Sequence, residues 1–205
     1  DLLRQCLTSV AVSVASLSHE VYVVDCDSRD QTAEMVRAEF PWVKLRQTAN
    51  IGFSRGNNVA LREILAAGPS LGLPRYVLLL NPDTVVPPTA LRAMVSFLDE
   101  RPSSGVAGPQ LLLRDGSLDL ACRRSFPTPA VSFYRMLGLS KLFPKSPRFG
   151  RYNMTFLDQN ETAQGDSVCG AAMLLRPTVP EQPGLPAGPV LSSGNNVGRA
   201  LRFPR

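Results

Sequence analysis

Two apolar runs, Val21-Tyr-Val-Val-Asp25 and Val77-Leu-Leu-Leu-Asn-Pro-Asp83, each lead into a carboxylate. Strands that are buried on both faces of a parallel sheet have this continuous apolar character. Ligands of an open α/β sheet bind beyond the carboxyl ends of its strands, so Asp25 and Asp83 are predicted to line one crevice. Between the two runs lies Asn50-Ile-Gly-Phe-Ser-Arg-Gly56, whose glycines would let the backbone approach a ligand closely.

Segments with helical spacing of apolar residues alternate with these runs, at 2–17, 33–40, 57–66 and 91–98. Such alternation is typical of the α/β class. We therefore expect residues 1–176 to form one domain with a Rossmann-like, mostly parallel sheet flanked by helices. No strand precedes the helix at 2–17, which predicts an unpaired sheet edge and a thinner core.

Composition narrows the classes of function. The chain has 205 residues, enough for one domain with a real core, and it contains no apolar run of about 20 residues that would span a membrane. We expect a soluble, cytoplasmic protein. The net charge of +5 is most simply that of a solvated basic surface, and it would also suit phosphate-rich substrates or an anionic membrane face. The arginines form no basic run, so no nucleic-acid partner is expected. The four cysteines have no zinc-site or disulfide-framework spacing.

The end of the chain has a different composition. Prolines at 177, 180, 183, 186 and 189 recur at every third position, which favours an extended polyproline helix over a packed core. We expect residues 177–205 to be an irregular tail, either aberrant through a changed reading frame or truncation, or a ligand for adaptor domains with aromatic grooves. Residues 123–165, where aromatic and basic residues interleave, are expected to be irregular as well.

Four motifs together resemble the family 2 glycosyltransferases, the inverting sugar transferases of the glycosyltransferase-A fold, and especially their rhamnosyltransferase-like branch. The resemblance covers roughly residues 1–176. The motifs, in the order of that family, are Val23-Val-Asp25-Cys-Asp-Ser-Arg-Asp30, Asn50-Ile-Gly-Phe-Ser-Arg-Gly-Asn-Asn58, Leu80-Asn-Pro-Asp83-Thr, and Pro109-Gln-Leu followed by Asp115-Gly-Ser-Leu118.

The resemblance implies a site for a nucleoside-diphosphate sugar. It places Asp25 on the base or ribose, and Asn50, Gly52 and Arg55 on the nucleotide and its phosphates. Asn81 and Asp83 occupy an Asp-x-Asp position of the family. Because Asn81 offers only a neutral oxygen, Asp83 would hold a divalent cation, Mg²⁺ or Mn²⁺, nearly alone. The alternative for each carboxylate is a plain turn or helix cap.

The acceptor side departs from the family. The segment Asp166-Ser-Val-Cys-Gly170 resembles the small-residue loop of the acceptor cleft, but no Glu-Asp or Asp-Asp pair follows it to supply a general base. Asp166 is a weak substitute, and the missing first strand would have helped to form the base pocket.

These observations leave three functions open. The first is transfer of a sugar to a glycan or lipid-linked acceptor in polysaccharide assembly. Rhamnose from dTDP-rhamnose is the candidate sugar, and peripheral association at the inner face of a membrane is the expected location. The second is a catalytically incomplete fragment that only binds a nucleoside diphosphate. The third, a nucleotidyltransferase, is disfavoured because the chain lacks a glycine-rich phosphate loop near its N-terminus.

Overall fold

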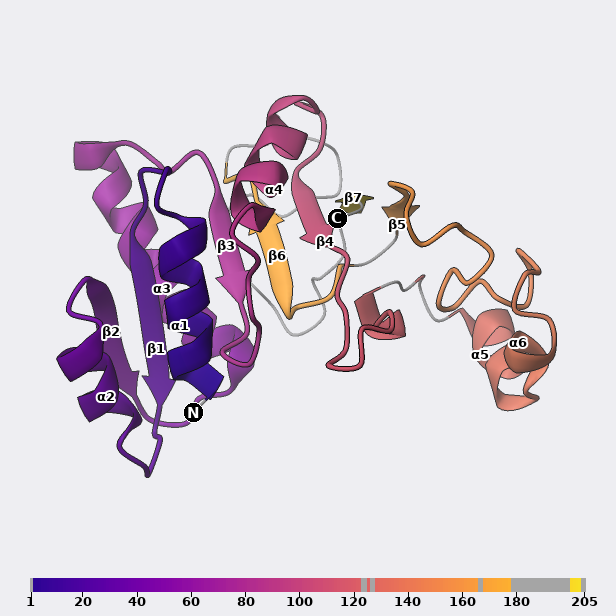
Figure 1. Ribbon diagram of the computed structural model, residues 1–205, viewed down its shortest axis with the longest axis horizontal. Coiled ribbons are helices and arrows are strands. Elements are labelled where there is room, and N and C mark those ends of the chain that lie inside the picture. Colours follow the sequence, from indigo (N-terminus) through magenta and orange to yellow (C-terminus); the bar gives the residue numbers. More distant parts are fainter. Residues whose placement is uncertain (1, 123–124, 126–127, 166–167, 178–199, 204–205) are drawn as a thin grey trace.

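The computed structural model describes the whole chain except residues 1, 123–124, 126–127, 166–167, 178–199 and 204–205. Helices and strands alternate through the first half, as the apolar periodicity predicted (Figure 1). In chain order, the elements are α1 (Leu2–Ser13), β1 (Val21–Cys26), α2 (Thr32–Glu39), β2 (Val43–Thr48), α3 (Phe53–Leu71), β3 (Val77–Leu80), α4 (Ala90–Asp99), β4 (Val106–Pro109), the 3-10 turn η1 (Leu120–Cys122), α5 (Pro129–Met136), α6 (Leu139–Leu142), β5 (Gln164–Gly165), β6 (Ala172–Leu175) and β7 (Ala200–Phe203).

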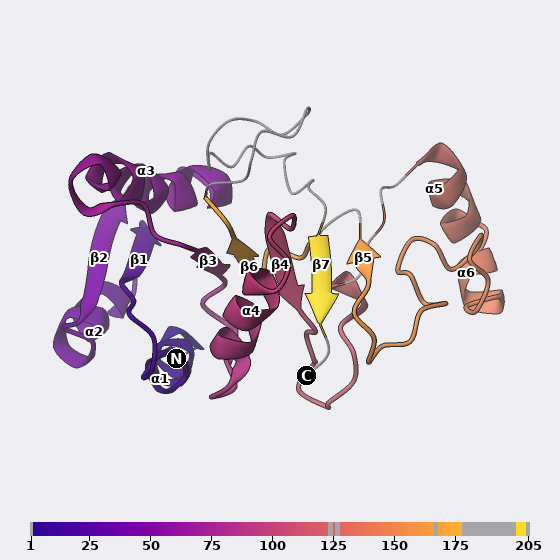
Figure 2. The ribbon, with the colours of Figure 1, turned by 90° about the horizontal axis from the view of Figure 1, so that it is seen from above.

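The strands form two hydrogen-bonded groups (Figure 2). β1 and β2 pair in parallel, from Val21 opposite Val43 to Cys26 opposite Thr48. The other five strands follow the order β3-β6-β4-β7-β5. The arrowheads of β1 and β3 point to the same edge of the molecule (Figure 1), so the predicted site residues follow strand ends on one side. The predicted α/β class is confirmed.

The five-stranded sheet is mixed. β6 runs antiparallel to both of its neighbours, β3 and β4, and β5 runs antiparallel to β7, whereas β4 and β7 are parallel. β3 and β4 therefore share one direction and are joined only through β6. Nothing in the apolar periodicity distinguishes these reversed strands, because an apolar run has the same appearance in either direction.

The core lies between the helices and the two sheets. α1 and α4 bury Cys6, Val10, Met94 and Leu98 against the side chains of β3, with Val21 of β1 at the margin. A second cluster joins α1 and α2 to the first sheet. Among the described strands, β1 and β3 are not paired with each other, and α1 packs beside both.

Three segments differ from the sequence-based expectation. α3 begins at Phe53, directly after Gly52 in the left-handed region at φ +81°, and so includes residues that were expected in a loop. The segment 123–165 is not uniformly irregular, because Thr128 Oγ1 accepts a hydrogen bond from Val131 N at 3.3 Å and Pro129 begins α5. Ala200–Phe203, expected within the irregular tail, form β7, while 178–199 lie outside the described residues.

Candidate functional site

Asp25 is the penultimate residue of β1, and only 5% of its surface is exposed. Its Oδ1 accepts a hydrogen bond from the backbone N–H of Ser28 at 3.0 Å, which closes the turn after the strand. Its Oδ2 accepts a bond from Nε2 of Gln47, the residue opposite Asp25 on β2, at 3.3 Å. Gln47 is itself oriented by Arg37 of α2, which donates to Oε1 of Gln47. The carboxylate is therefore held in one direction.

A hollow of about 320 Å³ opens beside this carboxylate. Asp27 adjoins it in the left-handed region at φ +70°, a conformation that Asp tolerates better than most residues. The hollow is lined by Asp25, Asp27, Ser28, Gln47, Thr48 and Ala49. It has the polar character of a site for a hydrogen-bonding ligand. Sequence reasoning identified Asp25 alone among these residues, because Gln47 and Thr48 join the site only through their pairing with β1.

The loop Asn50–Gly52 connects the hollow to α3. Asn50 Oδ1 accepts a hydrogen bond from Gly52 N at 3.3 Å, and Gly56 N donates to Gly52 O at 2.9 Å in the first turn of the helix. Arg55 is exposed on that turn. Within the described part of the chain its guanidinium has no hydrogen-bond or ion-pair partner. Arg55 is thus available to an anionic ligand.

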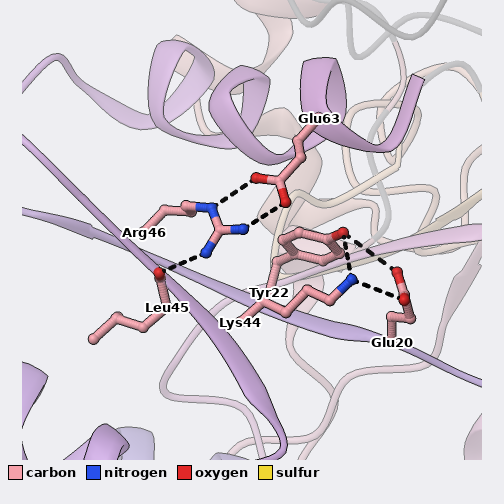
Figure 3. A network of polar contacts seen from close by, with 6 residues as sticks. All are labelled: Glu20, Tyr22, Lys44, Leu45, Arg46 and Glu63. Carbon is pink, nitrogen blue, oxygen red and sulfur yellow. Dashed lines mark hydrogen bonds and ion pairs between the residues drawn. The ribbon is translucent and has the colours of Figure 1, made fainter. Parts of the chain in front are cut away.

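α3 is fixed to the first sheet by a network of polar contacts (Figure 3). Arg46 of β2 donates from Nε and Nη2 to the two carboxylate oxygens of Glu63, at 2.7 and 2.5 Å. This bond with Arg46 lowers the pKa of Glu63. Beside it, Lys44 Nζ lies 2.8 Å from Oε1 of Glu20 and 3.2 Å from the hydroxyl of Tyr22. The Arg46–Glu63 pair holds the middle of α3 against β2, and the Lys44 contacts join β2 to β1 and to Glu20 just before it.

Asn81 and Asp83 form the turn after β3. Asn81 N donates to the carbonyl oxygen of Ala171 at 2.8 Å, and Thr84 N donates to Asn81 O at 3.2 Å. Asp83 is exposed, and no residue in the described ranges gives it a hydrogen bond or ion pair. Its charge acts on the buried thiol of Cys6, whose pKa rises to about 11, first through burial and then through Asp83.

Close backbone approaches join these parts into one region. A Cβ added to Gly56 would lie 2.8 Å from Cys26 Sγ, which places the start of α3 against the end of β1. A Cβ added to Gly170 would lie 3.7 Å from Cζ of Phe53, so the start of β6 faces the same helix end. Ala171 then binds Asn81. The structure therefore connects the Asp25 turn, the start of α3, the Gly170 loop and the Asn81 turn, although Asn81 and Asp83 do not line the 320 Å³ hollow itself.

The oxygen ligands of Asn81 and Asp83 suit a cation whose other ligands are substrate phosphates better than a metal that the protein holds alone. The described residues contain no group of three or more His, Cys, Asp or Glu side chains that would hold an ion. Magnesium bound through substrate phosphates needs only one or two carboxylates. The free carboxylate of Asp83 and the amide oxygen of Asn81 fit that requirement.

Two further predictions concern the general base and the membrane. Asp166, the candidate general base, lies outside the described residues. Within the described part of the chain, no helix combines the length and hydropathy needed to cross a bilayer.

The chain is similar to known proteins over most of its length. The family model described as Glycosyl transferase family 2 matches residues 1–161. N-acetylglucosaminyl-diphospho-decaprenol L-rhamnosyltransferase from two strains of Mycobacterium tuberculosis is 25% identical over 160 residues, which cover 76% of this chain and 51% of the relative. The chain thus spans about half the length of these curated relatives.

Solved structures of S. aureus TarS are also similar to part of this chain. A crystal structure of TarS 1–349 has 24% identity and a TM-score of 0.45, covering 64% of this chain and 36% of that one. The same protein in complex with UDP has 24% identity and a TM-score of 0.43, covering 63% and 35%.

Proposed function

This chain belongs to glycosyl transferase family 2, and on that premise we propose that it binds a nucleoside-diphosphate sugar beside Asp25 and transfers the sugar, with inversion, to a glycan or lipid-linked acceptor. The observation that carries the proposal is the fixed, buried carboxylate of Asp25 at the wall of a polar hollow. Within the described residues, each Asp25 oxygen accepts one hydrogen bond from the protein. A carboxylate oxygen accepts two, so each retains capacity for a ribose hydroxyl or a base N–H.

The diphosphate would lie along the start of α3. Asn50 and Gly52 shape the turn before the helix, and the exposed Arg55 supplies a planar group that pairs with phosphate oxygens through two hydrogen bonds. The backbone N–H groups of a helix N-terminus add to the attraction for an anion.

Asp83 and Asn81 would hold the divalent cation, Mg²⁺ or Mn²⁺. When bound, that ion would neutralise charge on the nucleoside-diphosphate leaving group. Asp83 is suited to this role because its carboxylate is exposed and unpaired within the described residues, whereas Asp25 is buried and already hydrogen-bonded.

The names of the relatives support a particular sugar and acceptor. The M. tuberculosis proteins are named for transfer of L-rhamnose to N-acetylglucosaminyl-diphospho-decaprenol. We therefore propose a deoxyhexose donor such as dTDP-rhamnose, a polyprenyl-linked acceptor, and a place in polysaccharide assembly. Because a lipid-linked acceptor is anchored in a bilayer, we also propose that the protein acts at the inner, cytoplasmic face of a membrane.

A second function, nucleoside-diphosphate binding without transfer, is favoured by one observation. In the stretch 171–205 the only acidic residue is Glu181, so that stretch supplies no carboxylate pair as a general base. Loss of a general base lowers a rate by about 10²- to 10⁴-fold. Asp166 remains the candidate base under the first function.

Thermal unfolding with dTDP, UDP and GDP, each with and without Mn²⁺, tests donor binding. A ligand at about 100 times its dissociation constant stabilises the folded state by about 2.7 kcal/mol. For a chain of this size that is a rise of about 5–10 °C in the midpoint. We expect a rise with one nucleotide, enhanced by Mn²⁺. No rise with any of the three would contradict the proposal.

Two variants refine the test. Asp83→Asn is expected to remove the Mn²⁺-dependent part of the rise and leave the midpoint without ligand unchanged. Glu161→Gln, a change at another exposed carboxylate, is the matched control. Release of nucleoside diphosphate from dTDP-rhamnose, measured with a polyprenyl-diphosphate N-acetylglucosamine acceptor, then separates transfer from binding alone.

A further inference from the structure

The net charge of the chain is concentrated in one segment. Residues 120–157 contain seven basic residues and no acidic one, whereas the rest of the chain contains 15 basic and 17 acidic residues. The segment therefore carries the whole positive excess. It also holds seven of the 14 aromatic residues. A one-sided charge of this kind attracts anionic surfaces.

The helices α5 and α6 in this segment expose large apolar side chains. Phe133, Met136 and Leu137 are 51, 77 and 55% exposed, and their spacing puts them on one side of α5. Leu142 at the end of α6 and Phe143 after it are 69 and 48% exposed. Single exposed apolar residues are ordinary, but five within 11 consecutive residues mark an interaction surface. We name residues 129–157 the α5–α6 segment.

The α5–α6 segment is packed rather than loosely extended. The rings of Tyr134 and Phe149 meet edge to face with centroids 5.1 Å apart. Arg148 donates to the hydroxyl of Tyr134 from Nε and Nη2, at 3.0 and 2.9 Å. Thr155 Oγ1 donates to the carbonyl oxygen of Pro144 at 2.6 Å, which closes the loop after α6. The exposed apolar residues thus lie on a formed structure that holds them in place.

We propose that the α5–α6 segment docks the protein onto an anionic lipid surface. Surfaces that bind the membrane interface combine apolar side chains, which enter the headgroup boundary, with Lys and Arg, which attract anionic lipid. Phe133, Met136 and Leu142 supply the first part; the exposed Lys141 and Lys145 supply the second. Within the described residues neither lysine has an ion-pair partner.

A lipid surface fits these residues better than a nucleic acid. Single-stranded nucleic acids bind by stacking bases on exposed aromatic faces. Here Arg148 lies 5.4 Å from the centre of the Tyr134 ring, and Arg135 lies 4.3 Å from that of Tyr152, so these rings already have partners. Exposed aliphatic side chains such as Met136 and Leu142 have no use in base stacking, whereas an acyl boundary accommodates them.

The location of the segment is compatible with the proposed function, on which this inference rests for its biological purpose. α5 and α6 lie at the end of the molecule opposite β2 in both views (Figures 1 and 2). Docking by this end would leave the hollow beside Asp25 open to a nucleotide sugar, while the membrane presented the lipid-linked acceptor.

Sedimentation of the full chain with vesicles tests the inference. We expect binding to vesicles of phosphatidylcholine with 30% phosphatidylglycerol, weak binding to phosphatidylcholine alone, and a loss of binding at high salt. Each basic residue near an anionic surface contributes about fivefold, so Lys141→Gln/Lys145→Gln should weaken binding about 25-fold. Met136→Asp/Leu142→Asp should weaken it at least as much.

Matched controls place equivalent changes elsewhere. Arg62→Gln/Arg92→Gln removes two exposed charges from α3 and α4, and Val12→Asp/Leu73→Asp changes two exposed apolar residues outside the segment. Both are expected to bind vesicles like the unmodified chain. Thermal unfolding checks that every variant is folded.

Any of three results would overturn the inference. The first is no sedimentation of the unmodified chain with anionic vesicles, the second is equal loss in the control variants, and the third is affinity for a single-stranded RNA oligonucleotide without vesicle binding. Nucleotide binding measured on the same samples reports separately on the proposed function, because vesicle binding requires no nucleotide.

Discussion

Arg46 of β2 binds both carboxylate oxygens of Glu63 on α3, at 2.7 and 2.5 Å. The pair joins the helix that begins at the candidate site to the sheet that ends there. Its side chains are 38 and 37% exposed, so water and salt weaken the attraction. An exposed pair of good geometry contributes about 0.2–1 kcal/mol.

Glu63→Gln is expected to lower the thermal midpoint by at most about 2–4 °C at pH 7. Because Arg46 lowers the pKa of Glu63 in the folded state, the stabilisation is complete above the ordinary pKa of 4.5 and is lost as the pH falls through the lowered value. The difference between Glu63→Gln and the unmodified chain should therefore vanish in acid. A difference of equal size at pH 7 and pH 3 would show that the pair acts by packing instead.

Gly56→Ala is expected to destabilise the chain by about 1–3 kcal/mol, because its Cβ would lie 2.8 Å from Cys26 Sγ. Gly170→Ala is the matched control, since its Cβ would meet Phe53 at an ordinary 3.7 Å. Combining Gly56→Ala with Cys26→Ala removes the clash and should restore much of the loss. Additive effects of the two substitutions in chemical unfolding would mean that the sulfur is not the obstacle.

Substitutions of Asp25 separate its structural role from its ligand role. Asp25→Ala leaves the Ser28 N–H without its acceptor and should cost about 1–3 kcal/mol of stability. Asp25→Asn keeps an acceptor oxygen and should cost less, yet weaken nucleotide binding because the negative charge is gone. Calorimetric titration with the nucleotide checks this expectation. Undiminished affinity in the folded Asp25→Asn variant would reduce Asp25 to a turn residue.

The cysteines are expected to react unequally with iodoacetamide. Burial and Asp83 raise the pKa of Cys6 to about 11, and only 4% of the residue is exposed, so it should stay unmodified at pH 8. Cys169 is half-buried and should react faster, as measured by peptide mass spectrometry. Because the unfolded thiol ionises near its ordinary value of 9.0, the contribution of Cys6 to stability should decline as the pH rises from 9.0 toward 11. Equal alkylation rates would contradict the burial of Cys6.

The sequence predicted the strands and helices whose apolar pattern is local. β1 and β3 stand out because their side chains are apolar without interruption before Asp25 and Asn81. α5 was missed although Thr128-Pro129 is a helix-start signal, because aromatic and basic residues on its exposed side obscure the usual apolar stripe.

The candidate site was predictable only in part. Asp25, Asn50 and Asp83 could be proposed as candidates because each lies at or just after the end of a strand. Gln47 could not, since its contact with Asp25 depends on the register between β1 and β2. The contact between Ala171 and Asn81 likewise depends on β6 entering the sheet beside β3, a long-range choice that local periodicity does not encode.

The insertion of β6 also sets the order in which the molecule can assemble during synthesis. Leu80 of β3 cannot form its strand pair until Ala172 of β6 has been synthesised. β3 and β4 therefore leave the ribosome with backbone N–H and C=O groups that β6 has not yet paired. At about 5–20 residues per second, the delay between β4 and β6 is roughly 3–13 s. Strand edges that stay unpaired for that time can pair with strands of neighbouring chains. The yield of folded protein should therefore depend on chaperones that shield the nascent strands, and slower translation should lower it.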